Sequence, residues 1–196
     1  MLRSSYSLFH SFKLSLWWFR SKFICWKVRL IRFPIDLRGK NKIDFGCNLT
    51  TGVGCRLEVF SSDNIKRLII GTNVQINDYV HISVMKKVKI GNNVLMASHI
   101  YISDNSHGLY KGEKEHTSPL LAPIERPYYI APVIIEDNVW IAEGVVIMPG
   151  VVIGKGCIIG ANAVVTKSIP SYSMAVGQPA KVIKVYNFAL NRWVIQ

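Results

Sequence analysis

Acidic residues are scarce in this chain of 196 residues, and none occurs among the first 33. Twelve aspartates and glutamates face 24 lysines and arginines, which gives a formal net charge of +12. Such a balance favours an anionic partner, whether a membrane surface, a nucleic acid or a phosphorylated ligand. The length is that of one folded unit rather than two large domains, and 49% apolar residues suffice to form a real core.

The sequence also lacks a long apolar run and paired cysteines. Basic residues interrupt every apolar run before it reaches the roughly 20 residues that a bilayer core requires, so no membrane span is expected. No compact apolar segment precedes a small-residue cleavage site, which argues against a signal peptide. The cysteines form no CxxC pair and no Cys/His cluster with zinc spacing, which predicts a reducing compartment and no structural metal. They are Cys25, Cys47, Cys55 and Cys157.

The first 33 residues combine seven basic residues with nine aromatic ones. Apolar residues recur there at steps of three and four, which places them on one stripe of a helix. They are Leu2, Tyr6, Phe9, Phe12, Leu16, Phe19, Phe23, Trp26 and Leu30. Two interpretations remain open. The helix either inserts its apolar face among anionic lipids, or docks on its own domain or on a sister subunit.

From residue 135 onward an aliphatic residue returns every six positions, in the series Ile135, Ile141, Ile147, Ile153, Ile159 and Val165. A second apolar series follows, with each member four residues after a member of the first, at Val139, Val145, Val151, Cys157, Ala163 and Ile169. Since side chains alternate along a strand, both series point inward, and Gly and Asn residues between them turn the chain. Neither a helix nor an ordinary sheet accounts for strict sixes, so the sequence predicts a solenoid of very short parallel strands.

The same spacing occurs earlier, at Ile70, Ile76 and Ile82 and then, after a slip of two residues, at Ile90, Met96 and Ile102. The slip puts His81 and His99 out of register, so stacked zinc ligands are not expected. The pattern then stops, and a polar stretch over about 107–132 predicts a protruding functional loop. The expected organisation is a helical segment over residues 1–34, a solenoid over 35–184 and a tail over 185–196.

Three further segments accompany the repeat, namely residues 138–141 (NVWI), 160–167 (GANAVVTK) and 177–184 (GQPAKVIK). With the repeat, they resemble the hexapeptide-repeat acyltransferases, which implies a mainly β fold built as a left-handed parallel β-helix. That handedness comes from the resemblance, because parallel crossovers are generally right-handed. The similarity covers about residues 43–184. It is closest to acetyl-CoA-dependent O-acetyltransferases acting on sugars, of the galactoside and maltose type, and especially to those of lipopolysaccharide O-antigen and exopolysaccharides.

The resemblance also implies a catalytic base. A sugar hydroxyl is a weak nucleophile until its proton is removed, and histidine suits this task because its pKa lies near neutrality. His107, in the segment ISDNSHG where the repeat ends, matches the family's catalytic histidine. Asp104 is a candidate to orient it, although acids in turns often just bond the local backbone. Asn77 resembles the family's sugar-binding asparagine, its alternative being a corner residue with left-handed backbone.

For acetyl-CoA, the resemblance implies contacts along the coils and at the C-terminal turn. The implied residues are Trp140, Ala142, Glu143, Ala161, Thr166, Lys167, Lys181 and Lys184. The last two would meet the CoA phosphates, since two lysines three apart after a Gly-x-Pro turn suit a phosphate clamp. Exposed lysines are usually only solvated. The chain departs from the family pattern at Ala142, Glu143 and Gln178, which puts contacts near Glu143 in question.

The family implies a homotrimer with active sites between subunits, so that Asn77 and His107 of one site can come from different chains. The expected acceptor is a sugar of a lipid-linked or surface polysaccharide precursor. The expected location is the cytoplasm, with residues 1–33 holding the enzyme at the inner membrane. A small soluble sugar or amino sugar is the second interpretation. A catalytically silent scaffold binding membranes or nucleic acid is the third, although the basic residues lack a nucleic-acid-binding motif.

Overall fold

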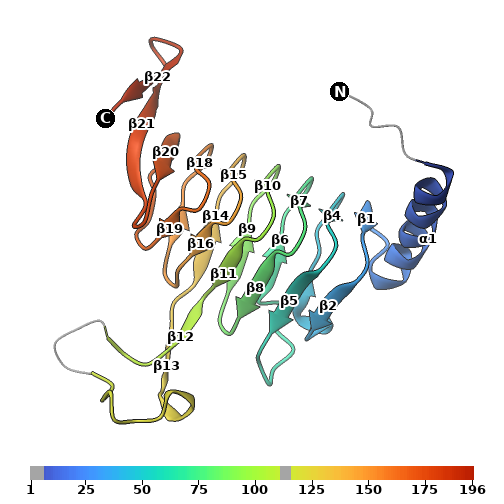
Figure 1. Ribbon diagram of the computed structural model, residues 1–196, viewed down its shortest axis with the longest axis horizontal. Coiled ribbons are helices and arrows are strands. Elements are labelled where there is room, and N and C mark those ends of the chain that lie inside the picture. The colour runs from blue at the N-terminus through green and yellow to red at the C-terminus, as the bar shows by residue number, and fades with distance from the viewer. Residues whose placement is uncertain (1–6, 111–115) are drawn as a thin grey trace.

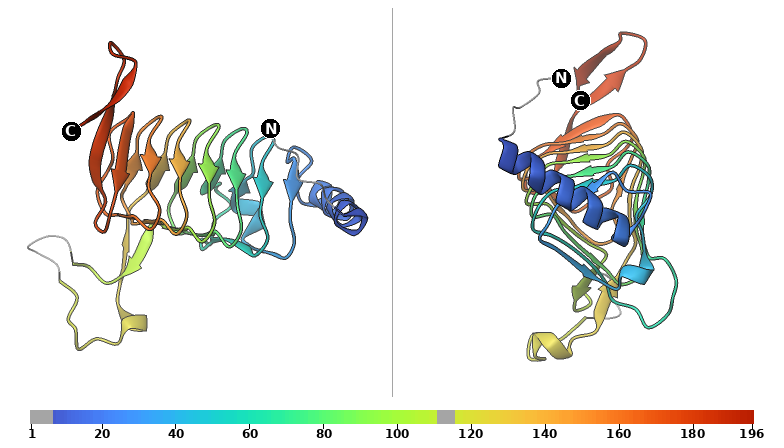
Figure 2. Two further views of the ribbon diagram at one scale, coloured as in Figure 1. Left: turned by 45° about the horizontal axis from the view of Figure 1, so that its top comes forward. Right: turned by 90° about the vertical axis from the view of Figure 1, so that its right-hand side faces the viewer.

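The computed structural model describes residues 7–110 and 116–196, in which short strands wind through three sheets, coil after coil (Figure 1). Viewed along its axis, the solenoid has a triangular outline (Figure 2). Its pairings are parallel in every coil, and antiparallel pairing occurs only at β12·β13 and in the C-terminal strands β20 to β22 among the described residues. The predicted parallel solenoid is therefore confirmed.

Each coil contributes one strand to each sheet, which we call sheets A, B and C. Sheet A contains, in spatial order, β1 (Leu30–Ile31), β4 (Thr50–Thr51), β7 (Gln75–Ile76), β10 (Leu95–Met96), β15 (Trp140–Ile141), β18 (Ile158–Ile159), β20 (Ser173–Val176), β21 (Lys181–Asn187) and β22 (Arg192–Ile195). Sheet B contains β2 (Ile35–Arg38), β5 (Cys55–Val59), β8 (His81–Val84), β11 (Tyr101–Ser103), β16 (Val146–Ile147) and β19 (Val164–Val165). Sheet C contains β3 (Ile43–Asp44), β6 (Leu68–Ile70), β9 (Val88–Ile90), β14 (Val133–Ile135) and β17 (Val152–Ile153).

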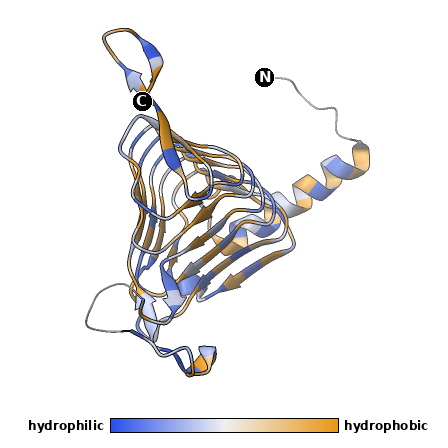
Figure 3. Ribbon diagram, turned by 60° about the vertical axis from the view of Figure 1, so that its left-hand side comes forward, coloured by the Kyte–Doolittle hydropathy of each residue, from blue (hydrophilic) through white to orange (hydrophobic). Residues whose placement is uncertain are grey.

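The core is a set of stacked aliphatic columns, one for each sheet. Ile141 pairs with Ile159 in sheet A, and the equivalent pairings in sheets B and C join Ile147 to Val165 and Ile135 to Ile153. Both predicted apolar series are buried throughout. Hydrophobic residues accordingly recur on successive strands of the coils in Figure 3. The predicted phase of the repeat is confirmed.

Asparagine turns the chain at the corner between sheets C and A. Asn48, Asn73, Asn93 and Asn138 each have a positive φ of 55° to 59°. Asparagine tolerates this left-handed backbone better than most residues. Each of the first three side-chain amides donates to the next side-chain oxygen, at 3.1 to 3.2 Å. The resulting ladder holds successive corners in register.

Helix α1 (Leu8–Ile24) lies across the N-terminal end of the solenoid (Figures 1 and 2). Its buried residues are Trp17 and Ser21. The Ser21 hydroxyl donates to the Trp17 carbonyl at 2.6 Å and accepts from the Ile31 amide at 2.7 Å, which ties the helix to β1. Within residues 7–110 and 116–196, no helix is both long and apolar enough to cross a membrane.

The described part of the predicted stripe faces away from this contact, and Leu2 and Tyr6 lie outside the described residues. The helix packs instead through a second face that contains Trp17 and Ser21. The expected docking of the helix on its own domain is therefore confirmed, but it uses the face of Trp17 and Ser21 rather than the predicted stripe. The stripe also ends sooner than predicted, because Leu30 belongs to β1.

Both ends of the solenoid extend beyond the predicted limits. Val28 and Ile31 are buried in the core, so the first coil begins inside the segment assigned to the helix, residues 1–34. At the other end, the expected tail over 185–196 forms a hairpin of β21 and β22 that continues sheet A. Its turn is stabilised by an aromatic cluster of Tyr172, Tyr186, Phe188 and Trp193. The repeat signal is absent from both ends.

Replacing Ile153 by Asp should lower the free energy of unfolding by several kcal/mol, because it would bury an unpaired carboxylate between coils. Val152→Asp is the matched control, since Val152 is its neighbour in β17 and points outward. Urea denaturation of the two variants measures the difference. Equal stability of both would contradict the inward position of Ile153.

Candidate active site

His107 lies at the base of the predicted loop, where the chain leaves the corner between sheets B and C. The loop begins as a two-stranded antiparallel ribbon of β12 (Asn105–His107) and β13 (Tyr128–Ile130), with residues 111–115 outside the described part. It protrudes from the solenoid, as predicted (Figure 1). The His107 ring is exposed and lies against Tyr128, with 4.5 Å between ring centroids. An exposed imidazole so held is free to exchange a proton with a bound ligand.

A cavity of about 520 Å³ opens beside His107, against the outer face of sheet B. Its lining is mostly polar or aromatic and includes Glu58, His81, Ser83, Tyr101, Ser103, Asn105, Ser106, His107, Tyr128 and Met148. The register of sheet B builds this wall, because Arg56, His81 and Tyr101 stand in one row and Glu58, Ser83 and Ser103 in another. Side chains from three successive coils thus face one ligand-sized space.

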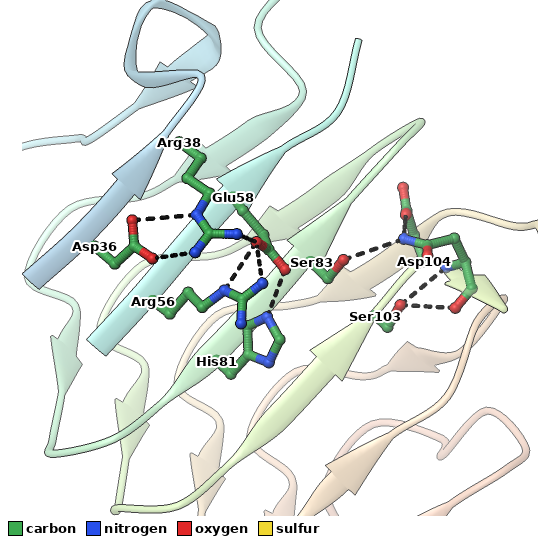
Figure 4. Close-up of polar contacts among 9 residues, drawn as sticks. Asp36, Arg38, Arg56, Glu58, His81, Ser83, Ser103 and Asp104 are labelled. Atoms are coloured by element: carbon green, nitrogen blue, oxygen red, sulfur yellow. Dashed lines mark hydrogen bonds and ion pairs between the residues drawn. The ribbon is translucent and has the colours of Figure 1, made fainter. Parts of the chain in front are cut away.

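A buried carboxylate anchors the wall (Figure 4). Glu58 is only 3% exposed, and it accepts from Arg56 at 2.7 Å and from His81 Nε2 at 2.7 Å. Arg38 contacts the same carboxylate at 3.3 Å and is also paired with Asp36 at 2.8 Å. A buried charge is stable only when it is paired and hydrogen-bonded, as Glu58 is. The network therefore fixes the His81 ring at the cavity wall.

This network was not predicted from the sequence. A signal was present, because Leu57-Glu58, Ile82-Ser83 and Ile102-Ser103 each place a polar residue after an inward aliphatic one. The inward residues lie 25 and 20 positions apart, however, rather than the 18 of a regular coil. A search for strict sixes does not align them.

Asp104 does not orient His107, which was one of its two expected roles. It is fully buried, and its carboxylate accepts from the backbone amides of Met85, Lys86 and Lys87 at 2.6 to 2.7 Å. Those three residues form the slip in the repeat. The hydrogen bonds among the described residues include none between Asp104 and His107. The expected orienting or substrate-binding role is therefore corrected to support of a turn, since no face of this carboxylate meets solvent.

Asn77 follows β7 at the corner between sheets A and B, away from the residues that line the cavity. Its side-chain oxygen accepts from Gln75 at 3.0 Å. The left-handed backbone at this corner belongs to Tyr79, with φ at 57°, rather than to Asn77. One chain therefore does not bring Asn77 and His107 into one cavity.

The residues implied for acetyl-CoA are distributed over two corners and the C-terminal hairpin. Ala142, Glu143 and Ala161 lie at the corner between sheets A and B, next to the exposed Trp140 in β15. Thr166 and Lys167 follow β19, at the corner between sheets B and C from which the His107 loop leaves.

The remaining observations concern Glu143 and the two lysines. The Glu143 carboxylate accepts from the Ser98 amide at 2.9 Å and so links neighbouring coils. Lys181 and Lys184 project from β21, at the end of sheet A.

Other nucleophiles and metal ligands are poorly supported. Burial raises the pKa of the Cys55 and Cys157 thiols, which disfavours thiolates at both sites. His81 pairs in register with Tyr101 while His99 stacks on Tyr79, so their predicted offset is confirmed. No group of three His, Cys, Asp or Glu side chains suited to a metal occurs in residues 7–110 and 116–196. Of the predicted site residues, His107 is the one that lines the cavity against sheet B.

Comparison with known proteins gives concordant results. The pattern of the family described as bacterial transferase hexapeptide (six repeats) matches residues 132–167. The provisionally named lipopolysaccharide biosynthesis O-acetyl transferase WbbJ of Escherichia coli K12 is 42% identical over 84% of this chain and 83% of its own. The galactoside O-acetyltransferase of the same organism is 36% identical over 60% of this chain and 54% of its own.

A similar fold occurs in a solved structure. The crystal structure of AntD, an N-acyltransferase from Bacillus cereus in complex with dTDP and 3-hydroxybutyryl-CoA, superimposes with a TM-score of 0.67. The match covers 84% of this chain and 82% of AntD, at 21% sequence identity. At this identity the similarity concerns the fold.

Asp104→Asn should lower the free energy of unfolding by about 2 kcal/mol, because an amide offers one acceptor oxygen and leaves at least one of the three backbone amides without its acceptor. Asp44→Asn is the control, since Asp44 is exposed and accepts one long bond, at 3.4 Å. Urea denaturation gives the stabilities, and a pH–rate profile tests for contact with His107. If Asp104→Asn leaves the free energy of unfolding unchanged but shifts the pH–rate profile, Asp104 orients His107 after all.

Proposed function

Because this chain belongs to the hexapeptide-repeat acyltransferases, we propose that it transfers an acetyl group from acetyl-CoA to a sugar hydroxyl in the biosynthesis of a surface polysaccharide, either a lipopolysaccharide O-antigen or an exopolysaccharide. The observation that carries the proposal is the exposed His107 beside a cavity of about 520 Å³ that polar and aromatic side chains line. The similarity to WbbJ over most of both chains supports the acceptor class.

In the proposed reaction, His107 removes the proton of the acceptor hydroxyl as its oxygen attacks the thioester carbonyl. The C–O bond forms, the C–S bond breaks, and the protonated imidazole returns its proton to the departing CoA sulfur. Nearby backbone N–H groups would stabilise the oxyanion of the tetrahedral intermediate. The cavity wall with His81 and Tyr101 offers hydrogen-bonding groups to the other sugar hydroxyls.

We propose that three copies form a homotrimer with left-handed coils and that each site lies in a groove between two copies. The distribution of the candidates supports this assembly. Thr166 and Lys167 share a corner with the His107 loop, whereas Asn77, Ala142 and Ala161 lie at the other edge of sheet B. A neighbouring copy that presents its other corner to this one would complete the set. The left-handed sense follows from the family.

The acceptor and the location are linked. A lipid-linked saccharide would require the enzyme at the cytoplasmic face of the inner membrane, where residues 1–33 would provide a peripheral contact. A small soluble sugar would require no such contact and is the second candidate. Release of free CoA with each acceptor distinguishes either enzyme from a silent scaffold. Mass spectrometry of the product locates the added acetyl group.

His107→Ala should lower kcat by about 10² to 10⁴, the usual contribution of a general base, and leave the affinity for acetyl-CoA nearly intact. His116→Ala is the matched control, because His116 is an exposed histidine of the same loop. CoA release and calorimetric binding measure the two effects. Near-normal turnover of His107→Ala would remove the assigned role.

Replacing Lys181 and Lys184 together by Glu should weaken CoA binding, since both lysines are assigned to its phosphates. Affinity for a pantetheine fragment without phosphates should change little. The double variant Lys89→Glu, Lys155→Glu is the control, because it changes the same charge beside sheet C. Equal losses for CoA and the fragment would indicate misfolding rather than a lost phosphate contact.

A further inference from the structure

Helix α1 presents two apolar faces, and only one of them is covered. At 100° per residue, the stripe that faces outward lies roughly 150° around the helix from Trp17 and Ser21, which are buried against β1. The outward residues are between 48% and 92% exposed. They are Leu8, Phe9, Phe12, Leu16, Phe19 and Phe23. An apolar surface of this kind marks an interaction site.

Basic groups border this stripe on both sides. Lys13 and Arg20 lie along one flank of the stripe, where Lys13 lies over the Trp17 ring and Arg20 over the Phe33 ring. On the other flank, Arg29 and Arg32 line a cavity of about 470 Å³ together with Trp18. No acidic residue lines that cavity. Apolar residues between basic ones match the division of a lipid surface into acyl chains and anionic headgroups.

The position of α1 decides between a membrane and a second copy of the chain. The helix covers the N-terminal end of the solenoid (Figure 2), and its exposed stripe lies on the side opposite the face that contacts β1. A neighbour packed side by side, as in the proposed trimer, contacts the sheets and corners rather than this end. The basic borders favour an anionic surface, whereas another copy would present the same positive charge.

We propose that the stripe of α1 and its basic borders dock on an anionic membrane, so that the solenoid stands on its N-terminal end. This inference deepens the peripheral contact included in the proposed function, and it does not depend on the acetyl transfer itself. The cavity beside His107 begins one strand spacing beyond the first coil, at Glu58 in β5, and the His107 loop leaves after β11, three spacings beyond it, about 14 Å along the axis. In this orientation the cavity faces a saccharide that extends from the surface.

Flotation of the full-length protein with vesicles tests the docking. We expect flotation with phosphatidylcholine vesicles that contain phosphatidylglycerol, little with phosphatidylcholine alone, and a decrease as salt is raised. Phe12→Ser should weaken partition about tenfold. Removing one charge from each border by Lys13→Gln and Arg29→Gln should weaken it about fivefold for each. Leu190→Ser, an exposed apolar residue of the C-terminal hairpin at the opposite end of the solenoid (Figure 1), is the control and should bind as the parent does.

Two outcomes would overturn the docking. One is failure of the parent protein to float with anionic vesicles. The other is dissociation of the oligomer in Phe12→Ser, by sedimentation, which would make the stripe a contact between copies. Phe12→Ser should retain CoA release with a soluble acceptor. A parent protein that floats but releases no CoA would instead refute the acetyltransferase and leave the docking intact.

Discussion

The stacking of one inward aliphatic side chain on the next is the constraint on which the rest of the structure depends. Strands of two residues have too few hydrogen bonds to be stable alone, and they persist because each coil buries its apolar columns against its neighbours. The asparagine ladder holds the corners at the same spacing. Outward positions and corners are thereby free to carry chemistry. The proposed site uses both.

Two buried carboxylates show how departures from the regular coil are stabilised. Asp104 receives three backbone amides and so holds the slipped corner at Met85 to Lys87. Glu58 is paired with two guanidinium groups and the His81 ring, and these partners stabilise its buried carboxylate on the outer face of sheet B. The slipped corner adjoins the point where the His107 loop leaves the solenoid, and Glu58 lies two strands away in sheet B, in the wall of the same cavity. The irregular coils, rather than the regular ones, therefore shape the cavity.

The sequence was most informative where one period dominates. Strict sixes from Ile135 to Val165 predicted the coils, and His107 was found where the pattern stops. The Glu58 and His81 pair was missed because it depends on coils of unequal length, which only three-dimensional register aligns. The role of Asp104 was misjudged because proximity in sequence to His107 does not determine where a carboxylate points. The exposure of the α1 stripe could not be predicted from the sequence either, because periodicity identifies an apolar face of a helix but not what covers it.

The central claim is that two copies complete one site, because a single chain places Asn77 and His107 at different corners of the solenoid. Mixing Asn77→Ala and His107→Ala chains, each inactive alone, after joint unfolding and refolding tests it most directly. Random assembly would give about one quarter of sites with both native side chains, so the account predicts recovery of roughly that share of CoA release. Mixtures that stay as inactive as the separate variants would contradict it.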